Sequence, residues 1–273
     1  MKIEATKANG TQNHFLILYS NNKNLHNKEV IQKLISKTDF KRVDGAIILS
    51  DKENLDFKMD YYNNDGTWET MCANGARCAV LYMYRKGHIK NKKMKFEAGD
   101  GLHLAEIENS NTVKLQMSIP KYCSDKIELL GVSGFHVDSG ATHFVIDYPK
   151  IDNQKVKDLG SQIRYHKKFG ERGINVDFYD ILDSHTIYVK TYEKGIEDLM
   201  MSCGSGSVAC AYHLSQISKI KSPLKVHVLG GELEIEFDKE KIQSSFTALG
   251  SIIDTPTVSS MIPTMKLASR QMK

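Results

Sequence analysis

The sequence predicts an α+β fold of two pseudo-symmetric domains, each a central helix wrapped by a curved, mostly antiparallel sheet. Strand-like and helix-like patterns alternate along the chain and return in the same order. Two cysteines beside glycines, Cys72 and Cys203, stand 131 residues apart, and each is followed 27 residues later by a glycine, Gly99 or Gly230. The segments that follow the cysteines are apolar nearly all round, as buried helices are.

In the first half, apolar residues at helical spacing follow an Asn27 cap and predict the first helix. Segments 43–49 and 57–62 have strand composition, and Asn64-Asp65-Gly66 predicts a turn. Segment 74–84 then predicts the central helix, which Gly87 ends.

The second half repeats this order. A helical stripe follows Asp152, segments 176–181 and 186–192 predict strands, and 205–217 predicts a helix that Pro223 ends. Gly99 and Gly230 each lie within a predicted pair of strands, 94–107 and 224–237. Upstream, Gly10 and Asn13 parallel Gly140 and His143. So long a period indicates a duplicated domain rather than a solenoid. We expect a first domain over 1–118 with the C-terminal segment 263–273, and a second over 119–262.

Composition excludes several classes of protein. The 273 residues are 41% hydrophobic and 26% charged, with a formal charge of only +4, which gives no nucleic-acid footprint. No stretch has the length of a membrane helix, and the N-terminus has no apolar signal core. We therefore expect a cytoplasmic protein without membrane or nucleic-acid partners, whose five cysteines are thiols. Cys78, Cys123 and Cys210 are expected in the core.

Cys72 and Cys203 each precede a short glycine-containing segment that opens a helix. The free N–H groups and the dipole of a helix N-terminus favour anions. A cysteine there is expected to ionise near neutral pH, and the same N–H groups can bind a carboxylate. Two such sites face to face would hold one substrate carboxylate between them. One thiolate would then remove the α-proton while the opposite thiol supplies a proton to the other face, which inverts the centre.

Rival interpretations of the cysteines are weaker. A zinc site from Cys72, Cys78, Cys203 and Cys210 would need C-x5-C and C-x6-C spacings, whereas structural zinc sites use shorter ones. No C-x-x-C redox pair and no nucleotide-binding glycine motif occurs. We predict no metal and no cofactor.

At these residues the chain resembles the diaminopimelate epimerase family over almost its whole length. Six ordered motifs make the resemblance specific, although each one alone would be weak. They are 71–78 around Cys72, 192–198 leading into 202–206 around Cys203, 7–15 with Gly10 and Asn13, Asn63-Asn64-Asp65-Gly66, 140–145 with His143, and Gly173-Ile174-Asn175-Val176.

The resemblance implies a role for each matching residue. Cys72 and Cys203 would be the acid/base pair, and no prosthetic group would be needed. The reacting carboxylate would be held by helix N–H groups at Ala73, Asn74, Gly204 and Ser205, with Gly75 and Gly206 in support. Five residues would line the rest of the pocket: Asn13, Asn63, Asn175, Glu193 and Lys194. His143, which alone would be a structural histidine, and Glu193 would orient or tune the thiols.

Several positions depart from the family pattern, and most concern substrate recognition. Lys194 stands where the family usually has Arg, which grips a carboxylate with a bidentate fork. The remaining departures are Ala141 for Asn, Thr142 for Pro, Gly45 for Gln, His14 for Asp and Ala73 for Gly.

We therefore expect an isomerase that epimerizes L,L-diaminopimelate to the meso form, in lysine or cell-wall synthesis. We expect it to be a monomer or homodimer whose partner is a small-molecule amino-acid substrate. The departures keep a racemase of another amino acid, such as histidine, as the alternative. A non-catalytic amino-acid-binding protein of this fold is a third hypothesis, which retention of both cysteines disfavours.

Overall fold

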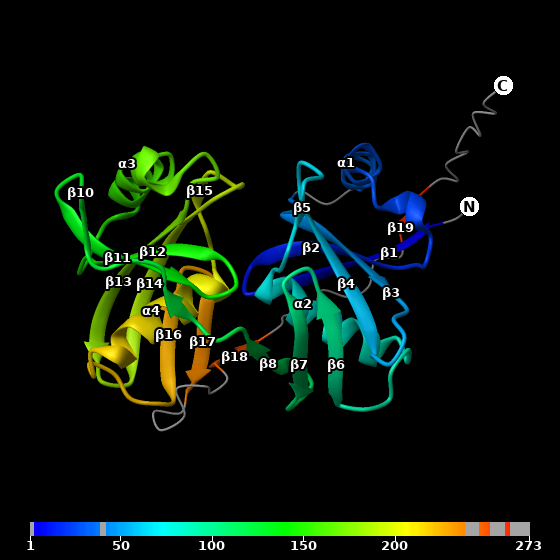
Figure 1. Ribbon diagram of the computed structural model, residues 1–273. Coiled ribbons are helices and arrows are strands. Elements are labelled where there is room, and N and C mark those ends of the chain that lie inside the picture. The colour runs from blue at the N-terminus through cyan, green and yellow to red at the C-terminus, as the bar shows by residue number, and fades with distance from the viewer. Residues whose placement is uncertain (1–2, 39–41, 238–245, 252–259, 263–273) are drawn as a thin grey trace.

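The computed structural model describes residues 3–38, 42–237, 246–251 and 260–262, and within them two similar halves stand side by side (Figure 1). The first half contains β1 (Ile3–Gly10), β2 (Asn13–Tyr19), a 3-10 turn (Lys23–Leu25), α1 (Lys28–Ser36), β3 (Gly45–Ser50), β4 (Phe57–Asn63), β5 (Trp68–Glu69), α2 (Ala73–Arg85), β6 (Lys93–Ala98), β7 (Gly101–Ile107) and β8 (Thr112–Met117). The second contains β9 (Lys121–Tyr122), β10 (Ile127–Leu129), β11 (Val132–Asp138), β12 (Thr142–Asp147), α3 (Asn153–Arg164), a 3-10 turn (Lys167–Phe169), β13 (Asn175–Asp183), β14 (Thr186–Glu193), β15 (Asp198–Leu199), α4 (Gly204–Gln216), β16 (Leu224–Val228), β17 (Gly231–Glu236) and β18 (Phe246–Ser251), and β19 (Ser260–Ile262) follows.

The order of elements confirms the duplicated α+β fold. Strands β1 to β8 with α1 and α2 are repeated by β11 to β18 with α3 and α4. The sheets are mixed: most neighbours are antiparallel, but β2–β3 and β4–β6 are parallel in the first half, as are β12–β13 and β14–β16 in the second. Parallel pairs arise where a helix or a long excursion separates two neighbouring strands.

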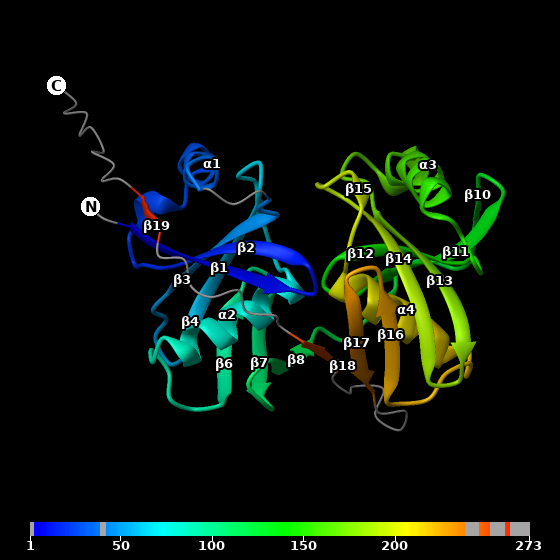
Figure 2. The same cartoon turned by 180° about the vertical axis from the view of Figure 1, so that it is seen from behind.

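The central helices α2 and α4 lie inside their sheets, as predicted from their all-round apolar sequences (Figures 1 and 2). One hydrophobic cluster runs through both halves and includes Val80 of α2 and Val208 of α4, both fully buried. The outer helices α1 and α3 cover the opposite faces of the sheets. Each contributes to its own smaller hydrophobic cluster, with Ile31 and Leu34 of α1 in one and Val156 of α3 in the other. Each sheet therefore separates two cores.

The start of α1 agrees with the sequence prediction, because the predicted cap Asn27 makes the expected hydrogen bonds, and Asp152, which precedes the second helical stripe, caps α3 in the same way. The Asn27 side chain accepts from the N–H groups of Glu29 and Val30, and the Asp152 side chain accepts from that of Lys155. α4 ends at Gln216, within one residue of the predicted end at 217. Ser218 adopts a left-handed conformation with φ 54° just beyond it, so the helix ends there and not at Pro223.

Cys123 corrects one prediction about the core. Cys78 and Cys210 are buried as expected, but Cys123 is exposed, directly after the two-residue strand β9. Its neighbours in sequence gave no helical or strand periodicity to place it, so the general tendency of free cysteines to be buried was a poor guide. All five cysteines are free thiols.

In the part of the chain that the structure describes, β8 and β18 are the pair of strands that joins the two sheets. β18 pairs with β17 of the second half and, antiparallel, with β8 of the first, from Phe246 opposite Met117 to Ser251 opposite Thr112. Figures 1 and 2 place this junction between the halves. β19 then returns to pair with β1. The division at 118/119 and 262/263 stays a prediction, and 263–273 lies outside the described residues.

No helix among the described residues has the length and hydrophobicity needed to cross a membrane.

Candidate active site

A cavity of about 500 Å³ lies between the two halves, and both Cys72 and Cys203 line it. All nine residues that the sequence suggested for substrate binding line the same cavity: Asn13, Asn63, Ala73, Asn74, Asn175, Glu193, Lys194, Gly204 and Ser205. The first half supplies the residues around Cys72, and the second half supplies those around Cys203. A ligand in this cavity would therefore contact both repeats at once.

Each cysteine is the N-cap of its central helix. Cys72 has φ −135° and ψ 109°, and Cys203 has φ −126° and ψ 110°, so both are extended, and the first N–H groups of each helix have no acceptor in the helical backbone. The N–H of Gly75 donates to Sγ of Cys72 at 3.5 Å, and the N–H of Gly206 donates to Sγ of Cys203 at 3.4 Å. The duplicated sequence thus places both sulfurs in the same geometry.

Burial has a larger effect on the thiols than the helix ends do. Desolvation raises the pKa of Cys72 to about 12, although the N–H of Gly75 opposes it. Desolvation also raises the pKa of Cys203 well above its usual value, and the nearby carboxylates of Glu193 and Asp177 add to this. The expectation that a helix N-terminus alone ionises the thiols near neutral pH is therefore wrong. Each thiol needs a proton acceptor or a change of environment.

The first turns of α2 and α4 touch each other. A Cβ on Gly204 would lie 2.7 Å from Cβ of Ala73, so the helices approach as closely as one methyl group allows. The side chain of Asn74 crosses this contact, because its Nδ2 donates to the carbonyl oxygen of Ser202 at 3.1 Å. Ala73, which departs from the glycine of the family pattern, is accommodated by the glycine opposite.

Gly99 and Gly230, the glycines at matched spacing, support the two cysteine loops in the same way. A Cβ on Gly99 would lie 2.8 Å from Cα of Thr70, two residues before Cys72. A Cβ on Gly230 would lie 2.9 Å from the carbonyl oxygen of Met201, two residues before Cys203. Because glycine has no side chain, the backbone at both places can pack directly against the residues that precede each cysteine.

On the first-half side, a chain of side chains leads from an aspartate to α2. Asn13 Nδ2 donates to Asp44 at 3.5 Å, and Asn74 Nδ2 donates to Oδ1 of Asn13 at 2.5 Å. The other amide atom of Asn74 accepts from Arg77 at 2.7 Å. Arg77 is fully buried and also donates to Thr11 at 3.0 Å, so it holds the start of α2 against the β1–β2 turn.

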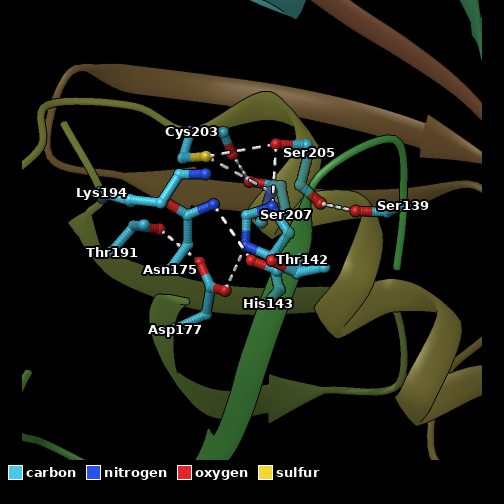
Figure 3. A network of polar contacts seen from close by, with 11 residues as sticks. Ser139, Thr142, His143, Asn175, Asp177, Thr191, Lys194, Cys203, Ser205 and Ser207 are labelled. Carbon is cyan, nitrogen blue, oxygen red and sulfur yellow. Dashed lines mark hydrogen bonds and ion pairs between the residues drawn. The ribbon is translucent and has the colours of Figure 1, made fainter. Parts of the chain in front are cut away.

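On the second-half side, the corresponding chain contains a histidine (Figure 3). His143 Nδ1 lies 2.7 Å from Oδ2 of Asp177, and its Nε2 lies 3.0 Å from Oγ of Ser205. Oγ of Ser205 is in turn 3.5 Å from Sγ of Cys203. His143 is fully buried and does not line the cavity, so it can reach Cys203 only through Ser205.

A third group of polar side chains lines the cavity where β4 and β14 end and β13 begins. Asn175 Oδ1 accepts from the N–H of Lys194 at 2.8 Å, and its Nδ2 donates to the carbonyl oxygen of Thr142 at 3.1 Å. A Cβ on Gly195 would lie 3.1 Å from Nδ2 of Asn63, so the halves also meet here. This wall offers amide groups and the Lys194 ammonium to a ligand.

Glu193 stands beside Cys203 in the cavity. Desolvation raises its pKa to about 8, whereas a hydrogen bond with Cys203 opposes that rise. Glu193 also raises the pKa of Cys72. One carboxyl group is therefore in electrostatic contact with both thiols and titrates close to neutral pH.

The glycines predicted in support lie behind the cavity wall. A Cβ on Gly75 would lie 2.9 Å from Cδ1 of Ile47, and one on Gly206 would lie 2.1 Å from Oδ1 of Asp177. Neither lines the cavity. They let other groups pack under the first turn of each central helix.

Sequence reasoning missed several residues that line the cavity. The polar ones include Asp44, Tyr61, Glu69, Thr70, His136, Asp138, Arg172 and Ser202. Tyr61 accounts for one departure from the family pattern, because a Cβ on Gly45 would lie 2.5 Å from its ring. Gly45 thus leaves room that the tyrosine fills. A polar residue interrupting a strand pattern was the only available signal for Asp44. Of the other departures, Ala141 and Thr142 line the cavity, whereas His14 does not.

Among the described residues, no group of three or more His, Cys, Asp or Glu side chains is arranged to hold a metal ion.

Comparison with known proteins agrees with this architecture. The family model of diaminopimelate epimerase matches residues 5–123 and 135–250. A diaminopimelate epimerase of Aquifex aeolicus is 34% identical over 257 residues, covering 87% of this chain and 91% of its own. One of Flavobacterium psychrophilum is 35% identical over 240 residues, covering 86% and 90%. Among solved structures, a probable proline racemase of Agrobacterium radiobacter has a TM-score of 0.73 at 13% identity over 95% of this chain and 93% of its own, a likeness of fold.

Proposed function

The chain belongs to the diaminopimelate epimerase family, and we propose that it interconverts L,L- and meso-diaminopimelate with Cys72 and Cys203 as the two acid/base groups. It is an isomerase. The observation that carries the proposal is the pair of cysteine N-caps, each with the same helix-start geometry, lining one cavity between the halves.

The reacting end of the substrate lies at the contact between α2 and α4. The main-chain N–H groups of both first turns, at Ala73, Asn74, Gly204 and Ser205, face one carboxylate. Helix N-termini bind anions, and charge that develops on the carboxylate as the α-proton leaves would be stabilised by the same groups. The α-carbon then has one sulfur on each face, so removal from one side and delivery from the other invert it.

Glu193 supports proton handling at this centre. With a pKa of about 8 and a hydrogen bond to Cys203, it can share a proton with that thiol near neutral pH. A bound substrate carboxylate would add a further negative charge to the site. The helix N-termini, and not Glu193, must compensate that charge.

The distal end of the substrate lies at the amide and ammonium wall. Asn63, Asn175 and Lys194 face the distal carboxylate, and Asn13 lies at the opposite side near Asn74. Lysine supplies a single point charge rather than a bidentate fork. The proposal includes a cytoplasmic monomer or homodimer, in keeping with five unpaired thiols.

Racemization of another amino acid, such as histidine, is the second candidate. The altered wall favours it: Ala141 presents no amide to the cavity, and Lys194 replaces a guanidinium. The same two thiols would carry out the chemistry, so only the ligand differs.

Proton exchange at the α-carbon separates these candidates. Purified enzyme under reductant, free of pyridoxal phosphate, is incubated in D2O with L,L-diaminopimelate and, separately, with L-histidine. NMR follows deuterium uptake, and chiral chromatography follows configuration. Deuterated meso product from diaminopimelate alone supports the proposal. Exchange with histidine alone moves the function to the second candidate, and no exchange with either refutes both substrates.

A further inference from the structure

The contacts behind Cys203 form a continuous path from a buried carboxylate to the sulfur (Figure 3). Asp177 and His143 have no exposed surface, and Oδ2 of Asp177 lies 2.7 Å from Nδ1 of His143. Nε2 of His143 is 3.0 Å from the Ser205 hydroxyl, and that hydroxyl is 3.5 Å from Sγ of Cys203. Every step is within hydrogen-bonding distance for its atoms.

Asp177 is fixed from three directions. Thr191 donates its hydroxyl to Oδ1 at 2.7 Å, and His143 occupies Oδ2. Cα of Gly206 closes the third side, since a Cβ there would lie only 2.1 Å from Oδ1. Within the described part of the chain, Asp177 forms no ion pair with a lysine or arginine. His143 is thus the group through which this buried carboxylate is compensated.

This arrangement determines where the histidine carries its proton. A carboxylate oxygen accepts hydrogen bonds, so Nδ1 of His143 must be the donor toward Asp177. The neutral ring then has its lone pair on Nε2, directed at Ser205. The Ser205 hydroxyl can donate to Nε2 while its oxygen accepts from the thiol of Cys203. The same division of roles orders the aspartate and histidine of a serine-protease triad.

We propose that Asp177 is a positioning residue that fixes the Nδ1–H form of His143, so that the Ser205 hydroxyl passes the Cys203 proton to His143. The S–H bond breaks as Ser205 gains that proton, and the hydroxyl proton of Ser205 moves to Nε2. The products are a thiolate and an imidazolium beside the Asp177 carboxylate, and reversal of the same steps restores the thiol. The inference rests on the proposed function, because it supplies the ionised Cys203 that the reaction uses as a base.

Among the described residues of the first half, no equivalent path is present. The matched chain there runs from Asp44 through Asn13 to Asn74, and carboxamides take up no proton at accessible pH. The relay is therefore specific to Cys203. This difference between the halves gives the experiment an internal reference, because Cys72 of the same molecule should not respond.

Other titratable groups also face this path. Glu193 of β14 is hydrogen-bonded to Cys203, His136 of β11 is in electrostatic contact with His143, and Cys210 of α4 is in electrostatic contact with Asp177. None of them touches Ser205 Oγ in the described structure. Asp177 also raises the pKa of Cys203 directly, so loss of its charge alone would speed alkylation of Cys203, whereas interruption of the path slows it. Slowing in both D177N and S205A therefore belongs to the path.

Cysteine alkylation tests the relay without any substrate. Wild type, D177N, S205A and D177N/S205A are treated with iodoacetamide from pH 6 to 9, and mass spectrometry measures the rate at Cys72 and Cys203 separately. At pH 7.5 we expect D177N and S205A each to slow alkylation of Cys203 at least tenfold, with Cys72 changed less than twofold. Because both substitutions interrupt one path, the double variant should be no slower than either single one. D180N, on the same strand and outside the cavity, should behave as wild type.

Three outcomes would overturn the proposal: an unchanged Cys203 rate in D177N, equal slowing of both thiols, or multiplicative effects in the double variant. If D177N does not fold, S205A and S205T decide the matter. S205T keeps the hydroxyl and should restore the rate that S205A loses, whereas equal rates for the two would refute the relay.

Turnover gives a second readout. Asp177 does not line the cavity, so D177N should lower kcat for diaminopimelate roughly 10- to 100-fold while KM stays within twofold. A raised KM with unchanged kcat would indicate a structural role instead. Failure of the wild type to exchange the α-proton of diaminopimelate would count against the proposed function, but it would leave the alkylation result valid.

Discussion

Asn13 and His143 occupy equivalent places in the two halves, and each joins an aspartate to the first turn of a central helix. Asn13 links Asp44 to Asn74, and His143 links Asp177 to Ser205. The scaffold is thus repeated while the chemistry is not, since an amide stands where the other half has an imidazole. The two thiols are placed symmetrically, but only the one in the second half has a neighbouring group that can take up a proton. This difference suits two thiols that must act as acid and base in alternation.

Replacing either thiol should abolish inversion. C72A and C203A are each expected to lower kcat at least about 1,000-fold, because one face of the α-carbon loses its proton carrier. Chiral chromatography of the product measures the loss. Near-wild-type turnover by either variant would exclude a two-base mechanism.

C123S is the matched control, because Cys123 is exposed and outside the cavity. Its activity should equal that of the wild type. Circular dichroism and thermal unfolding of all three variants check that the fold is retained, since removing one small side chain from each site should cost only about 1 kcal/mol.

The contact of Gly204 with Ala73 should respond to an exchange of sizes. G204A adds a Cβ that would lie 2.7 Å from Cβ of Ala73, so the two helix starts must separate. We expect the free energy of unfolding in urea to fall by about 1–3 kcal/mol, with a parallel loss of kcat. The double variant A73G/G204A removes the clash and should recover most of both. If the double variant recovers neither stability nor kcat, the effect of G204A arises from a contact other than that with Ala73.

Lys194 should contribute mainly to binding of the distal carboxylate. K194A removes a charge-assisted hydrogen bond, worth about 1.5–3 kcal/mol, so KM for diaminopimelate should rise roughly 10- to 150-fold. K194R should bind at least as well as the wild type, since a guanidinium can engage both oxygens. K168A, on the exposed surface outside the cavity, is the control. Equal KM values for K194A and the wild type would show that the substrate makes no contact there.

Glu193 should make stability depend on pH. Its folded pKa of about 8 lies above the ordinary 4.5 because of burial, so between these values the folded state holds the proton more tightly than the unfolded state. Stability should therefore fall as pH rises from about 4.5 to 8, by up to about 1.4 kcal/mol per pH unit. E193Q has no such proton and should lose this slope.

Urea unfolding of wild type and E193Q between pH 5 and 8 gives the slope of the free energy of unfolding against pH for each protein. The histidines are common to both, so their contribution cancels in the difference between the two slopes. E171Q, an exposed carboxylate outside the cavity, should keep the wild-type slope. Parallel curves for wild type and E193Q would mean that Glu193 is ionised in the folded protein throughout.

The repeated architecture and most of the cavity wall could be predicted because they depend on local sequence. Cys72 and Cys203 are found from their matched spacing, and each acts as a cap whose partner lies three residues away. Asn63 and Lys194 lie at the ends of their strands and Asn175 at the start of its own, and Asn175 and Lys194 meet because β13 runs antiparallel to β14. Periodicity and motif spacing are sufficient for such residues.

Buried charges could not be predicted in the same way. Arg77 interrupts an apolar helix and Asp177 interrupts a strand, and nothing nearby in sequence shows that their partners are Thr11, 66 residues away, or His143, 34 residues away. Tyr61 fills the space beside Gly45 only because two neighbouring strands bring them together. The pairing of β8 with β18 joins segments far apart in the chain. Each of these depends on tertiary neighbours.

The β8–β18 ladder limits how the cavity can admit a ligand. Its antiparallel hydrogen bonds run from Phe246 opposite Met117 to Ser251 opposite Thr112, and they tie the two sheets together along one line. If the ladder stays paired, a rotation about it moves the two halves apart. The sulfurs of Cys72 and Cys203, which lie in opposite halves, would separate and come together again in this rotation. One rotation would thus both release the product and re-form the active site.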